Sequence, residues 1–221
     1  MTSTNGSPDR IVWVDCEMTG LDLTKDALVE IAVVVTDSEL ELVDEGIDLI
    51  VAPPPGALDQ MVDIVREMHT VSGLLAALPE GLTLEEAGRQ VVDYVQGLVP
   101  EARRAPLAGN SVGTDRMFLE RDVPALTDHL HYRVIDVSSI KELARRWYPR
   151  VYFNAPPQAG GHRAMADILE SITELRYYRA ALFPSEPGPD SATAKRVAAE
   201  VAAQAERAVP DAAPTGTAHA G

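Results

Sequence analysis

The sequence predicts an α/β domain in which helices flank a mixed five-stranded sheet. Three segments rich in Val, Ile and Leu come first, at residues 11–17, 28–35 and 46–51, and turn signals separate them. Such an arrangement predicts an antiparallel meander. Helix-like segments then alternate with two more short strands, at residues 106–109 and 132–136. Leading strands followed by helix–strand alternation are typical of a mixed sheet covered by helices.

Each of the first three strands has its own pattern. The first is a short apolar run that ends in two acids, and residues 19–22 form the turn after it. The second is apolar almost without interruption, which predicts burial on both faces. The third stops at three consecutive prolines, Pro53, Pro54 and Pro55, because a proline cannot donate a hydrogen bond to a sheet.

The helices follow from apolar spacing and from capping signals. Thr83 and Glu86 form a capping box that opens one helix. Ile140, Leu143 and Trp147 line one side of a helix that begins at residue 139. The helix with the capping box is expected to span residues 83–98, and we expect further helices at residues 57–69, 72–78, 114–121 and 162–182.

Composition divides the chain into three parts. Residues 1–9 precede the first strand, and we expect them to be flexible. Residues 10–184 contain all the predicted strands and form one folded domain. Residues 185–221 are rich in Ala and Pro and nearly lack large apolar residues, so we expect a disordered tail. Its residues 192–209 have enough Ala for a transient helix, but little to pack against.

Charge narrows the range of functions. The chain of 221 residues carries 34 acidic and 19 basic residues, which give a formal charge of −15. Such a balance argues against binding to a long nucleic acid duplex, which depends on neutralising many phosphates. A very short nucleic acid held by metal ions and a few local bases remains compatible with it.

Several features of the sequence indicate the cytoplasm. Cys16 is the only cysteine, so no intrachain disulfide forms and a reducing compartment is expected. The first ten residues lack the apolar region of a signal peptide. No stretch approaches the roughly 18 apolar residues that a membrane-spanning helix needs. We therefore expect a cytoplasmic protein that contacts no membrane.

Asp15 and Glu17 are the first candidate site residues, at the end of the first strand. Residues i and i+2 of a strand point to the same face, so these two carboxylates are held together while Cys16 points the other way. The two charges repel each other and resist burial, and a divalent cation such as Mg²⁺ or Mn²⁺ would relieve both costs. The alternative is a strand that simply ends in two solvated acids.

Three titratable residues later in the chain are candidates for the same site. Asp115 opens a helix directly after a strand and loop, where sites often assemble in α/β sheets; alternatively it only complements the helix dipole. Asp167 lies one turn into the last helix, and its alternative is a solvated face. His162 follows the flexible residues 159–161, which leave its side chain free to swing, although an isolated histidine here is usually a surface residue.

These residues resemble the motifs of a known family. Asp15-x-Glu17, residues 110–115 and His162-(x)₄-Asp167 are similar to the three exonuclease motifs of the DEDDh exonucleases. Longer segments resemble the oligoribonucleases among them, at residues 13–21, 68–70, 109–116, 131–149 and 161–168. The resemblance spans about residues 10–183, so it implies that residues 10–184 are an exonuclease domain. It also implies a ribonuclease H-like fold.

The resemblance implies an activity and a cofactor. Very short oligoribonucleotides, down to dinucleotides, would be hydrolysed from the 3′ end to 5′-mononucleotides. Asp15, Glu17, Asp115 and Asp167 would hold two divalent cations, Mg²⁺ or Mn²⁺. His162 would take the proton from the attacking water, a task that suits an imidazole with an unperturbed pKa of about 6.5.

Three apolar or aromatic positions match substrate contacts of the family. Leu21 matches a wedge between two bases, although on its own it reads as a turn residue that lines the core. His69 matches a substrate-side position. At Ile64 the chain departs from the family, because many relatives carry a tryptophan there that stacks on a base. A second departure is Ala166, where relatives often carry an acid.

Five more positions match contacts at the other end of the substrate. Ser111, Ser138 and Ser139 match residues near the terminal 5′ phosphate, where hydroxyls and a helix N-terminus favour a dianion. The resemblance also implies a homodimer in which Tyr132 and Arg133 reach the active site of the partner subunit.

Two alternative functions remain open from the sequence. In the first, the same site on the same fold acts on DNA or longer RNA 3′ ends, and the long match at residues 131–149 argues against this. A catalytically inactive nucleotide-binding protein is the other alternative. The presence of all five active-site positions argues against that one.

Overall fold

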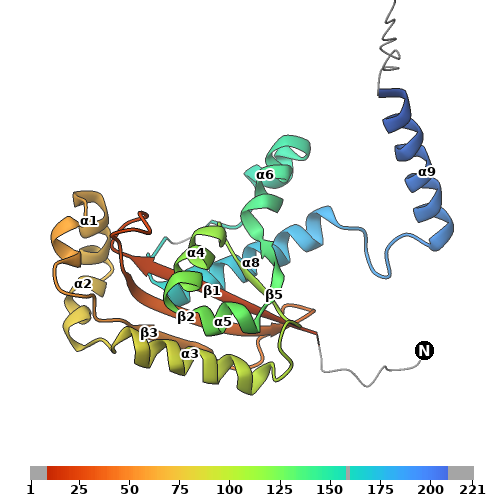
Figure 1. Ribbon diagram of the computed structural model, residues 1–221. Coiled ribbons are helices and arrows are strands. Elements are labelled where there is room, and N and C mark those ends of the chain that lie inside the picture. The colour runs from red at the N-terminus through yellow and green to blue at the C-terminus, as the bar shows by residue number, and fades with distance from the viewer. Residues whose placement is uncertain (1–8, 158–159, 209–221) are drawn as a thin grey trace, which may run out of the picture. The chain divides into compact units, whose positions relative to one another are not determined.

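A computed structural model describes residues 9–157 and 160–208. Within these residues, five strands form one mixed sheet in the order β3-β2-β1-β4-β5 (Figure 1). The first three strands pair antiparallel, and β4 pairs parallel with both β1 and β5. The strands are β1 (Arg10–Met18), β2 (Leu28–Asp37), β3 (Ile47–Ile50), β4 (Pro106–Gly109) and β5 (His131–Asp136). The predicted meander and the mixed sheet are confirmed.

The helices of this domain lie largely where they are predicted. They are η1 (Ala57–Gln60), α1 (Asp63–Val71), α2 (Leu74–Ala77), η2 (Leu78–Glu80), α3 (Leu84–Leu98), α4 (Gly113–Asp122), α5 (Pro124–His129), α6 (Val137–Trp147), α7 (Pro149–Phe153) and α8 (Ala164–Leu182). One difference is that the helix predicted over residues 57–69 is two helices, η1 and α1. The short helices α5 and α7 are not predicted, although each begins with a proline, which is well suited to the first position of a helix.

Helices cover both faces of the sheet (Figure 1). On one face, side chains from α3, α4 and α5 pack against the strands in a core that includes Val14, Ile31, Val91 and Phe118. On the other face, α6 and α8 pack in a second core around Trp13 and other residues of β1 and β2. Nearly every residue of β2 is buried, as its apolar run predicts.

Alternation along β1 assigns its residues to these two faces. Cys16 belongs to the core under α3 and is buried, which raises the pKa of its thiol. Trp13 belongs to the core under α8, and Asp15 and Glu17 follow it at intervals of two residues. Both acids therefore point toward the face that α8 covers.

The chain divides after Leu182 into a second unit. Its described residues contain one long helix, α9 (Ser191–Ala208), at the positions where the sequence predicts a transient helix within a tail. Alanine is the strongest helix former, which accounts for this helix. Residues 1–8 and 209–221, on which the expectations of a flexible N-terminus and of the rest of the tail depend, lie outside the described residues. Within the described ranges, no helix has the length and apolar character to cross a membrane.

Candidate active site

Three carboxylates from two elements meet beside β1. Asp15, Glu17 and Asp167 each offer one carboxylate oxygen, and these oxygens lie within 4.8 Å of one another. Asp167 occupies the first turn of α8, and α8 packs across β1 and β2. The packing of this helix on the sheet is what brings Asp167 to the two acids of the strand.

Burial makes these acids hard to ionise. Burial, with smaller contributions from neighbouring acids such as Asp115, raises the pKa of Asp15 to about 9. Burial and, to a smaller extent, the charge of Glu30 together raise the pKa of Glu17 to about 7. The pKa of Asp167 is also raised, chiefly by burial. Bound protons or cations are therefore needed to hold these groups together.

The chemistry of these side chains fits a hard divalent cation. Carboxylate oxygens are the ligands that Mg²⁺ and Mn²⁺ prefer, and the cluster offers several of them at one place. Exposed acidic groups often lie together without a metal, but Glu17 is buried and Asp15 and Asp167 are only partly exposed. A cation would replace the protons that the raised pKa values imply.

Asp115 lies next to the cluster but outside the group of three. Its side chain is buried in the first turn of α4, and its Oδ1 accepts a hydrogen bond from the backbone amide of Cys16 at 2.9 Å. This bond ties the first turn of α4 to β1 at Cys16, between Asp15 and Glu17. Burial raises the pKa of Asp115 to about 6, and the bond from Cys16 opposes that effect.

His162 directly precedes α8 on an exposed segment. Its φ is 48°, a left-handed conformation that is uncommon outside glycine. The pKa of Asp167 is raised chiefly by burial, and a positive charge on His162 opposes this rise. The neighbouring Gly160 and Gly161 face open space. His162 is thus close enough to Asp167 for the two charges to interact, on an exposed segment, and its part in the reaction remains a prediction.

Leu21 and Ile64 present large apolar side chains to solvent. Leu21 is 75% exposed in the turn after β1, and Ile64 is 74% exposed on α1. The turn that carries Leu21 is held by Asp26, which accepts hydrogen bonds from the Thr19 hydroxyl and the Asp22 amide. An apolar side chain held in water by a fixed turn is suited to contact a base.

His69 differs from the other two predicted substrate contacts because its ring is fully buried. Its Nε2 lies 2.9 Å from the carbonyl oxygen of Met18, which can only accept, so Nε2 carries a proton. Its Nδ1 lies 3.8 Å from Glu17 Oε2 and has no hydrogen-bond partner among the described residues. His69 therefore lies beside Glu17 without a hydrogen bond to it, and its contact with substrate remains a prediction.

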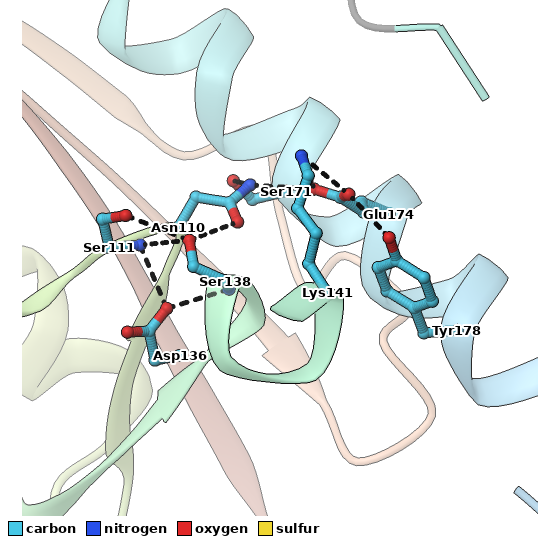
Figure 2. Close-up of polar contacts among 8 residues, drawn as sticks. All are labelled: Asn110, Ser111, Asp136, Ser138, Lys141, Ser171, Glu174 and Tyr178. Carbon is cyan, nitrogen blue, oxygen red and sulfur yellow. Dashed lines mark hydrogen bonds and ion pairs between the residues drawn. The ribbon is translucent and has the colours of Figure 1, made fainter. Parts of the chain in front are cut away.

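Ser111 and Ser138 lie together at the junction of β4 and α6 (Figure 2). The Ser111 amide donates to Ser138 Oγ at 2.9 Å and to Asp136 Oδ1 at 3.0 Å, and the two serine hydroxyls are 3.0 Å apart. Asp136 also caps α6 by accepting the amide of Ser138. Ser139 is exposed in the same first turn. The structure thus brings the three predicted serines to one helix N-terminus.

A polar network that the sequence does not reveal connects these serines to α8 (Figure 2). Asn110 accepts a hydrogen bond from Ser138 and donates to Ser171 and Glu174. Glu174 is buried, and Lys141 Nζ lies 3.1 Å from its Oε1. Only the packing of α8 on the sheet brings these residues together, so spacing along the chain gives no signal for them.

Tyr132 and Arg133 lie on the edge strand β5, and both are exposed. The Arg133 Nε donates to the Tyr132 hydroxyl at 3.1 Å, and its guanidinium lies 5.4 Å from the centroid of the Tyr132 ring. The Tyr132 ring also stacks on His131, with the two centroids 4.5 Å apart. An aromatic ring and a guanidinium thus project together from the sheet edge.

Comparisons with known proteins agree with this geometry. The RNase_T family model, described as an exonuclease, matches residues 12–175. The oligoribonuclease of Streptomyces coelicolor is 62% identical over 192 residues, which are 87% of this chain and 96% of that protein. The oligoribonuclease of Leifsonia xyli subsp. xyli is 59% identical over 195 residues, which are 88% and 94% of the two chains.

Solved structures share the fold. Exonuclease I from Methylocaldum szegediense has a TM-score of 0.59 and 19% sequence identity over 78% of this chain. A single-stranded DNA complex of E. coli exonuclease I has a TM-score of 0.57 and 15% identity over 79%. Both are larger proteins, and the match covers 41% of each of those chains.

Proposed function

The chain belongs to the oligoribonuclease family of exonucleases, and we infer that it is a 3′-to-5′ exoribonuclease that hydrolyses very short oligoribonucleotides, down to dinucleotides, to 5′-mononucleotides. The observation that carries this inference is the group of three carboxylates from β1 and α8, with Asp115 bound to the backbone of β1 beside them. A solvated helix face or strand end would not collect buried acids in this way.

We assign the metal-binding role to Asp15, Glu17, Asp115 and Asp167, and two Mg²⁺ or Mn²⁺ ions as their cofactors. When bound, such ions make a water acidic and stabilise charge on the leaving oxygen. His162 accepts the proton of the attacking water, because it stands exposed beside Asp167 on a segment that leaves its ring free to turn.

The substrate lies between two groups of residues in this proposal. Leu21 and Ile64 contact the bases through their exposed apolar surfaces, and His69 supports this side. Ser111, Ser138 and Ser139 receive the terminal 5′ phosphate at the N-terminus of α6, where a dianion is favoured. A site closed at the 5′ end would leave no room for a longer chain, which accounts for short substrates.

We propose a homodimer in which Tyr132 and Arg133 enter the site of the partner subunit. Support comes from large apolar side chains that stay exposed on α6 and α7. Trp147 at the end of α6 is 66% exposed and Phe153 at the end of α7 is 78% exposed. The apolar stripe of α6 is thus only partly used inside this chain. A second copy covering these side chains would bury them.

The proposal also assigns the bounds of the catalytic domain and the cellular compartment. Residues 10–184 are the exonuclease domain, and the first compact unit ends close to that boundary, at Leu182. The cytoplasm is the expected place of action, since RNA fragments arise there and the single cysteine suits a reducing compartment.

A comparison of substrate lengths tests the function. A 5′-labelled diribonucleotide and a labelled long single strand of RNA are each incubated with the full chain and Mn²⁺ or Mg²⁺, and parallel samples contain a chelator. We expect cation-dependent release of mononucleotides, with the diribonucleotide cleaved faster. Equal or better cleavage of the long strand, or of single-stranded DNA, would contradict the assignment of short RNA. Binding without cleavage would instead favour an inactive nucleotide-binding protein.

A further inference from the structure

Glu30 is a fully buried acid next to the candidate active site. It lies on β2, and Glu17 is its direct partner in the register of β1 and β2. Its exposed fraction is 0%. A carboxylate removed from water in this way is stable only when hydrogen bonds and an opposite charge compensate it. The partners of Glu30 therefore show what it holds in place.

Both oxygens of Glu30 bind the beginning of α8. The Nε of Arg163 donates to Oε1 at 2.7 Å, and Nη2 of the same guanidinium lies 2.6 Å from that oxygen. The backbone amide of Ala164, the first residue of α8, donates to Oε2 at 3.1 Å. One carboxylate thus pairs with a guanidinium and also satisfies one of the free amides of a helix N-terminus.

These two bonds fix the chain directly after His162. On the other side of His162 are Gly160 and Gly161, which are exposed and have open space where a Cβ would lie. His162 itself adopts a positive φ of 48°. The backbone of His162 is therefore held on its C-terminal side, at residues 163 and 164, and is preceded on its N-terminal side by two glycines that restrict it little. The same fixed point starts α8, whose first turn carries Asp167.

We propose that Glu30 and Arg163 are positioning residues of the reaction, which clamp the start of α8 so that His162 reaches the water beside the acidic cluster. The inference rests on the proposed function and deepens it. Neither residue needs to touch the substrate, because the guanidinium is already engaged by Glu30 and the carboxylate is buried. Their effect passes through the backbone of residues 162–164.

The variants separate positioning from stability. Glu30→Gln removes the charge but keeps an oxygen that can accept the Ala164 amide. Arg163→Lys keeps the positive charge but loses the several N–H donors of the guanidinium. If Glu30→Gln does not fold, Arg163→Lys alone tests the proposal. Arg176→Gln is the matched control, because Arg176 also ties α8 to the hairpin after β2, through Leu40 and Glu41, far from His162.

Steady-state hydrolysis of a diribonucleotide by the full chain gives the first measurement. We expect Glu30→Gln to lower kcat by about 10- to 100-fold, as a displaced catalytic group does, with KM within about threefold. Arg163→Lys should lower kcat by about tenfold, and Arg176→Gln should leave it unchanged. In a His162→Ala background, Glu30→Gln should have almost no further effect, since the imidazole that it positions is gone.

Hydrogen exchange of the backbone amides gives a second measurement that needs no activity. Glu30→Gln and Arg163→Lys should speed exchange over residues 160–167, whereas Arg176→Gln should not. The clamp is contradicted if exchange there is unchanged. If the double variant loses kcat by the product of the two single losses, the two substitutions act independently. That result would contradict the proposal that Glu30 acts through His162. A wild-type chain that cleaves no RNA would overturn the proposed function and the positioning role together, and the exchange data would still decide whether the clamp exists.

Discussion

The carboxylates of Asp15 on β1 and Asp167 on α8 are held together, with an oxygen of each within 4.8 Å of the other. A strand and a helix that are far apart in the sequence thus place their carboxylates in one cluster. Each acid raises the cost of ionising the other groups, and the charge of Asp167 is one of the causes that raise the pKa of Asp15. The stability of the protein should therefore depend on pH and on cations.

The first prediction concerns stability without cations. The pKa of Asp15 rises from an ordinary 3.8 to about 9 on folding, so the native state keeps a proton that the unfolded chain releases. The contribution of this proton to the free energy of unfolding is fully present below the pKa of Asp15 in the unfolded chain. It is lost as the pH rises toward the pKa of Asp15 in the folded protein. In a chelating buffer, Asp15→Asn should remove this loss. It should unfold at least about 3 °C above the wild type at about pH 8, a shift that about 1 kcal/mol gives at this size.

Thermal unfolding at about pH 5 and about pH 8, with a chelator or with Mg²⁺, measures the effect. Cations bind the ionised carboxylates, so Mg²⁺ should stabilise the wild type more at the higher pH and should stabilise Asp15→Asn less. If the unfolding temperature of the two proteins depends on pH in the same way, Asp15 is not the group that causes the loss of stability.

The second prediction concerns the proton acceptor. His162→Ala should lower kcat for a diribonucleotide by roughly 10²- to 10⁴-fold, the usual size of a general-base effect. Binding of the dinucleotide should change little, because His162 lies on an exposed segment. Ala166→Ser, at an exposed neighbour in α8, is the control and should match the wild type. A His162→Ala protein with normal turnover would remove the imidazole from the mechanism.

Apolar runs and turn signals were sufficient to predict the sheet. The strands are long enough to show their pattern, and the meander needs only neighbours in sequence. The helices α5 and α7 have 6 and 5 residues, too few for apolar periodicity to appear. The break between η1 and α1 lies at Met61 and Val62, whose extended backbone leaves no clear mark in the sequence.

The candidate site was predictable only in part, for a physical reason. Asp15 and Glu17 are neighbours on one strand, so alternation alone joins them. The contacts of Asn110 with Ser171 and Glu174 depend on how α8 crosses the sheet, which no local pattern encodes. Glu30 did leave a signal, because it is the only acid within the apolar run of residues 28–35. A buried charge there requires a partner.

The third prediction concerns base contacts at Ile64. The side chain is exposed on α1, so a larger ring would not disturb the core. A flat ring stacks on a base with about 1–3 kcal/mol of free energy. Ile64→Trp should therefore lower the KM for a diribonucleotide by about tenfold with little change in kcat. Ile64→Leu keeps the apolar contact without a ring and should resemble the wild type. A KM unchanged by the tryptophan would place the bases elsewhere.

The last prediction tests the proposed exchange of residues between subunits by mixing two inactive proteins. His162→Ala lacks the proton acceptor, and Arg133→Ala lacks the guanidinium that projects from the edge strand β5. If Arg133 serves the partner's site, a mixed dimer contains one site with a native His162 from one subunit and a native Arg133 from the other. Unfolding and refolding the two variants together should then restore up to about one quarter of wild-type activity. With random pairing, about half the dimers are mixed, and each mixed dimer has one intact site out of two. Each variant refolded alone is the control. If Arg133 instead serves its own subunit, every site in the mixture lacks one of the two groups, and the activity of the mixture should stay at the level of the separate variants.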